Sequence, residues 1–300
     1  MNKLIRNIKH PRELTIKILD RLSFLIPTDR LYLRIRYFLF MKKPLHLRKP
    51  ETFNEKLQWL KLYNRNPLYT TLVDKYEVKD YVAKKIGSEH IIPTLGVWNS
   101  ADEIDFDSLP DKFVMKCTHD SGGLIICKDK SKLNIASARK VLEKTLKRSY
   151  YSVSREWPYK NVKRRIIAEK FMQDEHSQIL NDYKFFCFDG KVKVLFIATD
   201  RGIDTRFDFF DTDFNHLDIV NGHPMSDRKI EKPATFDEML AIAEKLSQGI
   251  PHVRVDLYEI NGKVYFGELT FSHWGGTIPF EPEVWDYKFG SWITLPQKRS

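Results

Sequence analysis

Two acidic residues interrupt a pair of apolar, strand-like segments near the C-terminus, within VRVDLYEINGKVYFGELTF at 253–271. The two segments flank Asn261-Gly262, a dipeptide typical of a tight hairpin turn. Asp256 and Glu268 lie inside the segments, where an unpaired carboxylate is costly to bury. A shared cation would satisfy both acids, and hard oxygen ligands of this kind suit Mg²⁺. The pattern predicts a metal site, provided that the hairpin brings the two acids to one face.

The register of this hairpin decides whether the acids can meet. A strict two-residue turn would pair Asp256 with Gly267 and send Asp256 and Glu268 to opposite faces of the sheet. A three-residue loop centred on Gly262, or a β-bulge, would pair Asp256 directly with Glu268. We predict the second arrangement, because only it makes one metal site. An edge hairpin with two solvated acids is the alternative that this segment alone leaves open.

A second candidate is the segment KCTHDSGGLIICK at 116–128. Two strands joined by a small polar loop offer backbone N–H groups that can fold over phosphate oxygens, here at Ser121, Gly122 and Gly123. Lys116, at the end of the first strand, would place a point charge beneath them. The loop is not a Walker A motif, since no Gly-Lys-Ser/Thr follows. In isolation, an ordinary hairpin turn is the better explanation of this segment.

Two further segments are suited to ligand binding. IIAEKF at 166–171 is an apolar strand that ends in Glu169, Lys170 and Phe171, a composition suited to the lip of an adenine pocket. SHWGGTIPF at 272–280 contains Gly275-Gly276, which permits close backbone approach to a ligand. His273 is either an acid/base residue or, more commonly for a lone histidine, a packing and hydrogen-bonding residue.

The order of elements indicates an α+β or mixed α/β fold rather than a purely parallel sheet. TFNEKLQWLK at 52–61 predicts a helix that Thr52 and Glu55 cap, and residues 72–87 predict a second helix that ends at Gly87. Strands are expected at 91–98, 113–117, 124–128 and 166–172, hairpins around Asp189-Gly190 and Asn261-Gly262, and helices at 136–148 and 236–247.

The positive charge is concentrated at the N-terminus. Residues 1–61 hold fifteen Lys and Arg against five Asp and Glu, an excess that equals the net charge of +10 of the 300-residue chain. Such a segment attracts an acidic polymer or an anionic lipid surface, while a nucleic-acid partner is not expected, since no recognition motif is present. Residues 14–40 mix apolar and basic residues at helical spacing, which fits helices lying on a membrane surface or packed on their own domain.

Neither a signal peptide nor an apolar run long enough to span a membrane is found. The three cysteines lack the CxxC spacing of a zinc site, and their odd number argues against a disulfide framework. We therefore expect a cytoplasmic protein, with the N-terminal segment as a point of contact with the inner membrane surface.

Together, these segments resemble the ATP-grasp superfamily of carboxylate–amine ligases, in particular its teichuronopeptide-biosynthesis (TupA-like) branch from polysaccharide clusters. The resemblance runs from about Phe53 to Pro282. Its most specific parts are DKYEVKDYV at 74–82, VMKCTHDSGG at 114–123, DYKFFCFDGKV at 182–192 and the hairpin at 253–271.

The resemblance implies a role for each candidate residue. Lys75 and Lys116 would contact phosphate, Ser121, Gly122 and Gly123 would form the loop over the triphosphate, and Glu169, Lys170 and Phe171 would form the adenine hinge. Asp256 and Glu268 would be Mg²⁺ ligands, with Arg254 beside the transferred phosphoryl group and Lys184 as a further cofactor-binding lysine. The family usually places Asn two residues after the second acid. Thr270 holds that position here, so its part in metal coordination is open.

The implied activity is ATP-dependent amide formation through an acyl phosphate. The partners would be ATP with Mg²⁺, a carboxylate such as that of a uronic-acid sugar or polysaccharide, and an amine or amino acid. The resemblance divides the chain into a basic helical segment (1–66), a helix and linker (67–110), a small ATP-grasp subdomain with the phosphate loop (111–172) and a large one with the Mg²⁺-binding hairpin (173–300).

Two other functions compete with this one. A polysaccharide glycosyltransferase would need a metal-binding DxD motif, which Asp211-Thr212-Asp213 matches formally, although no Gly-rich nucleotide turn precedes it. A non-catalytic protein that keeps the ATP-grasp shell is the second alternative, and the departure at Thr270 is the feature that supports it.

Overall fold

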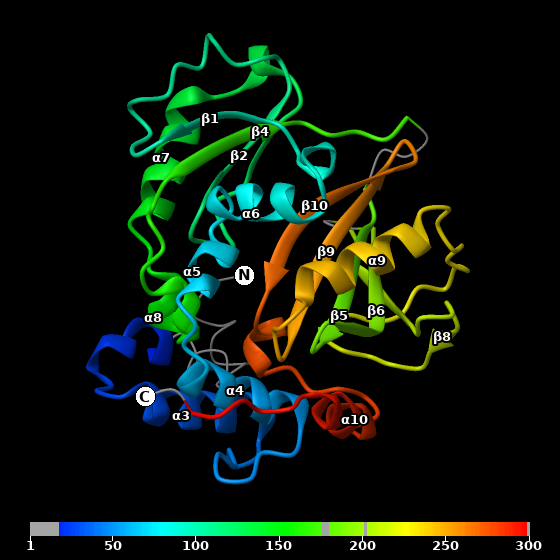
Figure 1. Cartoon of the computed structure of the whole chain (residues 1–300). Coiled ribbons are helices and arrows are strands. Elements are labelled where there is room, and N and C mark those ends of the chain that lie inside the picture. The colour runs from blue at the N-terminus through cyan, green and yellow to red at the C-terminus, as the bar shows by residue number, and fades with distance from the viewer. Residues whose placement is uncertain (1–17, 176–179, 201–202, 299–300) are drawn as a thin grey trace, which may run out of the picture.

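Two antiparallel sheets, each covered by helices, form the body of the protein in a computed structural model (Figure 1). The structure describes residues 18–175, 180–200 and 203–298. This mixed α+β architecture confirms the predicted fold class. Residues 1–17, which hold five of the fifteen Lys and Arg of the predicted basic segment, lie outside the described residues.

The smaller sheet has the strand order β1-β4-β2-β3. Its strands are β1 (Thr94–Trp98), β2 (Phe113–Cys117), β3 (Ile125–Cys127) and β4 (Ile166–Lys170). Along β2, Phe113, Met115 and Cys117 are buried against helix α7 (Ile135–Leu146). The alternate residues Val114 and Lys116 point to the opposite face, because successive side chains of a strand alternate. That second face is open to the larger sheet.

The larger sheet has the strand order β10-β9-β5-β6-β7-β8. Its strands are β5 (Asp182–Phe188), β6 (Lys191–Thr199), β7 (Arg206–Phe210), β8 (His216–Leu217), β9 (Val253–Ile260) and β10 (Lys263–Thr270). Helix α9 (Phe236–Ser247) packs on one face, and α5 (Leu68–Val73) and α6 (Glu77–Ile86) join the same core. Part of the other face packs on α4 (Phe53–Tyr63) and α10 (Val284–Trp292), around the fully buried ring of Phe53.

The N-terminal helices lie below the two sheets in Figure 1. Short helix η1 (Ser23–Leu25) precedes α3 (Asp29–Met41), which packs through Tyr37 and Met41 on Trp59 of α4. The predicted cap of α4 is confirmed, since Thr52 accepts a hydrogen bond from the backbone N–H of Glu55 and Glu55 returns one to Thr52. The remaining short helices are η2 (Ser88–His90), η3 (Lys130–Lys132), α8 (Tyr150–Ser154), η4 (Trp157–Tyr159) and η5 (His273–Gly276).

The continuous helix predicted over 72–87 is wrong, because the chain breaks between α5 and α6. The Asp74 carboxylate accepts hydrogen bonds from the backbone N–H groups of Tyr76 and Glu77 at 2.8 and 3.2 Å, which starts a new helix. Its other oxygen accepts a hydrogen bond from Nη2 of Arg165 at 2.8 Å. Lys75 lies in the break, and its backbone N–H donates to the carbonyl of Thr118, beside the loop that follows β2.

The register predicted for the β9–β10 hairpin is confirmed, and a bulge sets it. Ile260 pairs with Lys263 across a two-residue Asn261-Gly262 turn, yet farther along Asp256 pairs with Glu268. The extra residue is Gly267, between Phe266 and Glu268. A Cβ atom at this position would lie 3.0 Å from the carbonyl oxygen of Asp256, so glycine suits the close approach of the two strands.

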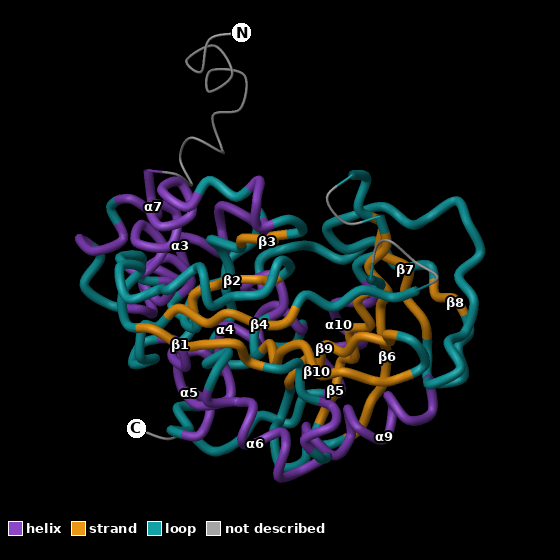
Figure 2. Tube along the Cα trace, turned by 90° about the horizontal axis from the view of Figure 1, so that it is seen from above, coloured by secondary structure: helices purple, strands orange, loops and turns teal. Residues whose placement is uncertain are grey.

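The strands β9 and β10 of the larger sheet lie beside β4 of the smaller one when the molecule is seen from above (Figure 2). The site described below lies between these two sheets. Cys117, Cys127 and Cys187 are buried free thiols, in agreement with the predicted lack of disulfides. Within the described ranges, none of the helices has the length and apolar character needed to cross a membrane.

Candidate active site

Three neighbouring strands carry charged side chains on one face of the larger sheet. Asp256 of β9 is paired with Glu268 of β10 on one side and with Lys184 of β5 on the other. Residues that are directly opposite in antiparallel strands share a face, so all three side chains project to the same side of the sheet. The structure therefore brings together three of the predicted site residues.

Arg254 connects this charged face into one network. Its Nε and Nη2 atoms donate to the two oxygens of Asp256 at 2.6 and 2.7 Å, a bidentate arrangement. Nη2 also donates to the hydroxyl of Thr270 at 3.0 Å and lies 3.5 Å from Oε1 of Glu268. Lys184 places its ammonium 2.5 Å from Asp256. Two acids and two cations thus hold one another in fixed positions.

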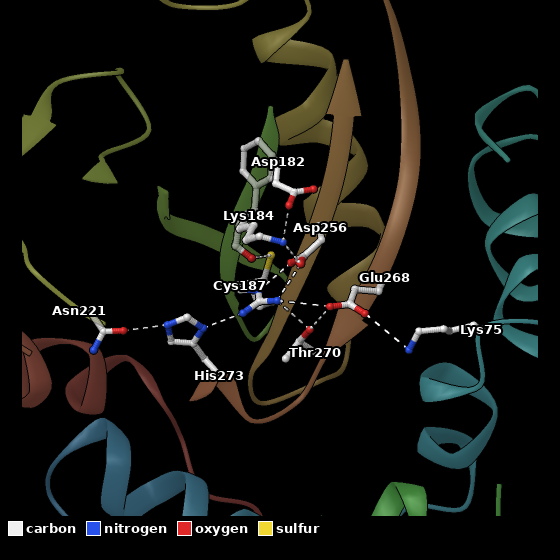
Figure 3. Close-up of polar contacts among 11 residues, drawn as sticks. Lys75, Asp182, Lys184, Cys187, Asn221, Asp256, Glu268, Thr270 and His273 are labelled. Carbon is white, nitrogen blue, oxygen red and sulfur yellow. Dashed lines mark hydrogen bonds and ion pairs between the residues drawn. The ribbon is translucent and has the colours of Figure 1, made fainter. Parts of the chain in front are cut away.

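His273 accepts a hydrogen bond from Arg254. The remaining Arg254 nitrogen donates to His273 Nδ1 at 2.6 Å, and His273 Nε2 lies 2.8 Å from the side-chain oxygen of Asn221 (Figure 3). Burial lowers the pKa of His273 well below its usual value, and the positive charge of Arg254 lowers it further. His273 is therefore a neutral acceptor that orients Arg254, which resolves the two roles that the sequence left open in favour of hydrogen bonding.

Glu268 is the acid most strongly influenced by its surroundings. Burial alone would raise the pKa of Glu268, but neighbouring cations outweigh that effect and lower it to about 2. These cations are Lys75, Lys184, Arg254 and Lys116. Lys75 lies 3.8 Å from Glu268 and approaches from the helix break opposite the sheet (Figure 3). The carboxylate is held ionised, the form that binds a cation.

The donor set fits a magnesium ion. Asp256 and Glu268 present carboxylates on one face, and the Thr270 hydroxyl lies 3.2 Å from Glu268. No cluster of three His, Cys, Asp or Glu side chains able to hold a metal occurs within the described ranges. Mg²⁺ is commonly held by one or two protein carboxylates, with substrate phosphates and water completing its coordination. Asp256 and Glu268, which both line the larger cavity described below, meet that requirement.

Lys116 and Lys79 share one buried carboxylate in the smaller sheet. Glu169, with a side chain 7% exposed, lies 2.5 Å from the ammonium of Lys116 and 2.6 Å from that of Lys79. Burial would raise the pKa of Glu169, but the two lysines lower it. Sequence reasoning assigned Glu169 to an adenine hinge and missed Lys79, which looks like any surface lysine of an amphipathic helix.

Two adjoining cavities lie between the sheets. One, of about 510 Å³, is lined by apolar residues of both sheets, together with Lys79, Glu169, Lys170 and Phe171. The other, of about 680 Å³, contains Lys184, Arg254, Asp256, Glu268 and Thr270. Lys75, Lys116 and Gly267 line both cavities. The arrangement offers an apolar pocket that leads into a strongly charged one.

The loop after β2 contributes unequally to these cavities. Ser121 and Gly122 line the larger cavity. Gly123 has a left-handed φ of +71° and turns back to α7, where a Cβ atom would lie 2.2 Å from the Thr145 hydroxyl.

The predicted adenine hinge lies at the end of β4. Lys170 donates its backbone N–H to the carbonyl of Pro93 at 3.0 Å. Among the described residues, no hydrogen-bond partner is found for the backbone of Phe171 or Met172.

Arg206 and the Asp211-Thr212-Asp213 segment line neither cavity. Arg206 pairs with Asp204 at 2.6 Å, and Arg201 lies outside the described residues. The Asp211 carboxylate accepts hydrogen bonds from the backbone of Asp213 and Asn215 at 3.0 and 2.8 Å. The apparent DxD motif is therefore a β7–β8 turn that lines neither cavity.

A model of the family described as TupA-like ATPgrasp matches residues 55–294 of this chain. That range includes both sheets and every residue of the charged network. No curated protein matches the chain.

Solved structures that match are remote in sequence. They include D-alanine–D-alanine ligase from Bacillus anthracis, at 17% identity and a TM-score of 0.39, with 67% of this chain and 57% of that chain covered. An L-amino acid ligase from Bacillus licheniformis is 12% identical at a TM-score of 0.44, with 82% and 56% covered. The ATP-grasp ligase PsnB, complexed with a minimal precursor, is 11% identical at a TM-score of 0.41, with 73% and 60% covered. The chain thus spans less than two thirds of the length of these structures.

Proposed function

The chain belongs to the TupA-like ATP-grasp family, and from this premise we propose that it is an ATP-dependent ligase that joins a carboxylate to an amine. The observation that carries the proposal is the charged network in the larger cavity. There, Asp256 and Glu268 lie on one face among Arg254, Lys184 and Lys75, with Lys116 lining the same cavity. A triphosphate with its metal needs this combination of cations for oxygens and carboxylates for the ion.

The apolar cavity is proposed to receive the adenine base. Val114 and Ile126 from the smaller sheet, and Tyr258 and Phe266 from the larger one, supply walls for a flat ring. Phe171 and Met172, which follow β4, line the same cavity, and their backbone groups would hydrogen-bond the edge of the purine. The triphosphate would then extend past Lys75 and Lys116, which line both cavities.

The first chemical step follows from this placement. A substrate carboxylate oxygen attacks the γ-phosphorus of ATP, the bond to the bridging oxygen breaks, and ADP leaves with an acyl phosphate formed. Arg254 and the lysines would stabilise the charge spread over the transferred group. Asp256 and Glu268, with Thr270 beside them, would hold Mg²⁺, which when bound offsets phosphate charge. The Ser121–Gly122 part of the loop would limit access of water to the acyl phosphate.

The second step forms the C–N bond. The amine nitrogen attacks the acyl carbon, and inorganic phosphate leaves with the electrons of the broken C–O bond. The nitrogen then loses a proton to give the amide. This sequence consumes ATP and releases ADP and phosphate, and it needs no oxidant or reductant.

The carboxylate substrate is proposed to belong to a uronic-acid sugar or polysaccharide of the cell surface. An aromatic wall at the cavity mouth supports this assignment. Trp274 is 42% exposed there, with Phe207 and His223 ring centroids 6.2 and 6.0 Å away. The apolar face of a pyranose ring packs well on an exposed indole, as apolar surfaces do on aromatic rings generally.

The protein is proposed to work in the cytoplasm, at the inner surface of the membrane. Helix α3 supports this location, because Leu31, Ile35 and Phe38 are exposed along one stripe of the helix. The exposed basic residues Arg30 and Arg34 flank the stripe. Apolar and basic residues on one helical surface are typical of a helix that lies in a lipid interface.

ATP turnover with a panel of uronic acids and amines tests the proposed function. We expect ADP release that depends on Mg²⁺, on a carboxylate and on an amine, with a matching amount of amide. Asp256→Asn and Glu268→Gln should each abolish it. UDP release from a nucleotide sugar without ATP use would favour the glycosyltransferase. ATP binding without turnover under any combination would favour a non-catalytic binder.

A further inference from the structure

Two oppositely charged residues that the proposed chemistry does not use are buried in the larger cavity. Lys61 of α4 is 5% exposed, and Glu156, between α8 and η4, is 2% exposed. Both line the cavity that holds Arg254 and Glu268. No Glu156 oxygen lies within 4.0 Å of the Lys61 ammonium, so the two side chains do not form a contact ion pair, although each charge shifts the pKa of the other towards the ionised form. Buried charges are costly unless a partner neutralises them.

The hydrogen bonds of this pair leave capacity on the cavity side. The Lys61 ammonium donates to the carbonyls of Ser154 and Gly275 at 3.2 and 2.7 Å, which leaves its third hydrogen. The Tyr150 hydroxyl donates to one Glu156 oxygen at 3.3 Å. For the other oxygen, Oε2, no hydrogen-bond partner is found within the described part of the chain. Burial lowers the pKa of Lys61 to about 8 and raises that of Glu156 to about 7.

The pair also lies close to the proposed reaction centre. The charge of Glu268 acts on both Glu156 and Tyr150, and that of Arg254 acts on Tyr159. The rings of Tyr150 and Tyr159 form one wall beside Glu156, with centroids 4.6 Å apart. A group bound to Glu156 would therefore lie in the same cavity as the charged network of Arg254, Asp256 and Glu268.

We propose that Glu156 and Lys61 bind the ammonium and the carboxylate of a zwitterionic α-amino acid, the amine co-substrate of the ligase. A simple cation would meet the positive charge of Lys61, and a simple anion would meet Glu156. Only a ligand with both charges a few bonds apart satisfies the two buried residues together. The inference rests on the proposed ligase function, and it narrows the amine to one chemical class.

The proton balance of the second step accommodates this assignment. The ammonium transfers one proton to the Glu156 carboxylate and becomes a neutral amine with a free electron pair. That amine forms the C–N bond as the C–O bond to phosphate breaks. The second proton leaves with the departing phosphate. Glu156 would then release its proton to solvent after the amide has left.

Binding of free amino acids tests the inference without any turnover. The probes are the twenty common L-amino acids with D-alanine and D-glutamate, titrated calorimetrically into the protein. We expect one or more to bind, and Glu156→Gln to weaken that binding by about ten-fold or more, since a charge-assisted hydrogen bond is lost. Glu231→Gln, which removes an exposed acid paired with Lys229, is the matched control. Wild-type protein that binds none of the probes would overturn the inference.

An analogue of the amino acid that lacks the carboxylate charge tests the role of Lys61 separately from that of Glu156. The amide of the best amino acid lacks the carboxylate charge, and we expect it to bind wild type more weakly by about ten-fold. In Lys61→Gln this discrimination should disappear, and thermal unfolding checks that the variant is folded. Equal discrimination in wild type and Lys61→Gln would contradict the role of Lys61.

Hydroxylamine distinguishes failure of this inference from failure of the proposed function. It is largely uncharged at neutral pH and traps an acyl phosphate as a hydroxamate. We expect Glu156→Gln to raise the ratio of hydroxamate to amide by about ten-fold. The substitution weakens binding of the charged amino acid more than binding of the uncharged hydroxylamine. An unchanged ratio would reject the amino-acid site while the ligase stands. No hydroxamate from wild type with any carboxylate would reject the ligase itself, and the binding experiments would still decide the site.

Discussion

Lys116 and Lys79 approach the same buried carboxylate, that of Glu169, at 2.5 and 2.6 Å. The two lysines come from different elements, β2 and α6, and Glu169 comes from β4. One acid thus links the smaller sheet to the helix that follows the Lys75 break. It also holds Lys116 at the point where the two cavities join.

Replacement of Glu169 by glutamine should destabilise the protein strongly. Two ammonium groups would then be left near one neutral amide in a buried position, and loss of one partner of a buried ion pair costs about 3–5 kcal/mol. The free energy of unfolding, measured with urea, checks this expectation. Glu231→Gln, which removes an exposed partner of Lys229, is the control and should cost about 1 kcal/mol or less. Equal costs for the two variants would contradict the linking role of Glu169.

Gly267→Ala should separate the two proposed metal ligands from one another. The new Cβ atom would lie 2.9 Å from the Tyr258 ring and 3.0 Å from the Asp256 carbonyl, so the bulge must shift. We expect a loss of unfolding free energy of about 1–3 kcal/mol, as for an overpacked site, together with loss of Mg²⁺-dependent ADP release.

Gly262→Ala in the same hairpin provides the comparison. Gly262 has a φ of +71°, and an added Cβ atom there meets nothing within 4 Å. The left-handed backbone should still cost about 1–2 kcal/mol. ADP release should nevertheless survive, because the register at Asp256 is unaffected. If both variants keep full activity, the bulge is not what brings the acids together.

Local sequence patterns were sufficient to predict most elements of the fold. Alternation and the Asn261-Gly262 turn predicted the β9–β10 hairpin, and the need to satisfy two acids within apolar strands predicted its register. The bulge at Gly267 was inferred only as one of two possibilities, because the sequence does not show which residue leaves the ladder. The break at Asp74 was missed although its capping bonds to the N–H groups of Tyr76 and Glu77 are local. Only the pairing of Asp74 with Arg165, ninety-one positions away, lies beyond a local pattern.

The missed site residues share a physical reason. Lys61, Lys79 and Glu156 are ordinary polar residues of a helix or loop when the sequence is read locally. They become site residues only because tertiary packing buries them beside the cavities. Burial of a charge is a property of the folded chain, so no local pattern could have identified them.

His273 should act as a positioning residue for Arg254 and not as an acid or base. His273→Leu removes the acceptor for the Arg254 guanidinium, and we expect kcat to fall by about ten-fold or more, the effect of a lost hydrogen bond to a charged group. His273→Asn keeps an acceptor near the Nδ1 position and should retain more of the activity. The pH profile between about 5 and 8 should keep its shape in both variants. Loss of one limb of that profile would instead assign a proton-transfer role to His273.

The ionisation of Glu268 should make stability depend on acid pH. Its pKa is lowered from 4.5 to about 2 by surrounding cations, so the folded state favours the ionised form. The resulting stabilisation is present above about pH 4.5 and is lost as the pH falls towards 2. We expect the stability difference between wild type and Glu268→Gln to narrow as the pH falls from 6 to 3. Urea unfolding at a series of pH values measures it, with Glu231→Gln as the control whose difference should stay constant.

The exposed stripe on α3 should bind anionic lipid. Leu31, Ile35 and Phe38 are 46%, 37% and 58% exposed, and the first 61 residues carry an excess of ten positive charges. A variant with serine at all three positions should lose vesicle affinity by at least about ten-fold, since each large apolar side chain contributes roughly 1 kcal/mol or more on burial in lipid. Cosedimentation with phosphatidylglycerol vesicles measures the loss.

Three exposed apolar residues on other elements serve as the matched control. Leu68, Val141 and Val284 are 41%, 41% and 62% exposed, and serine at these positions should leave vesicle binding unchanged. Neutral phosphatidylcholine vesicles should bind wild type more weakly, because the basic residues find no charge there. One outcome would contradict lipid binding by the stripe: the stripe variant and wild type sediment equally with anionic vesicles, and polyuronate releases both proteins from them. The basic segment would then recognise negative charge alone. The acidic polymer would then be its partner.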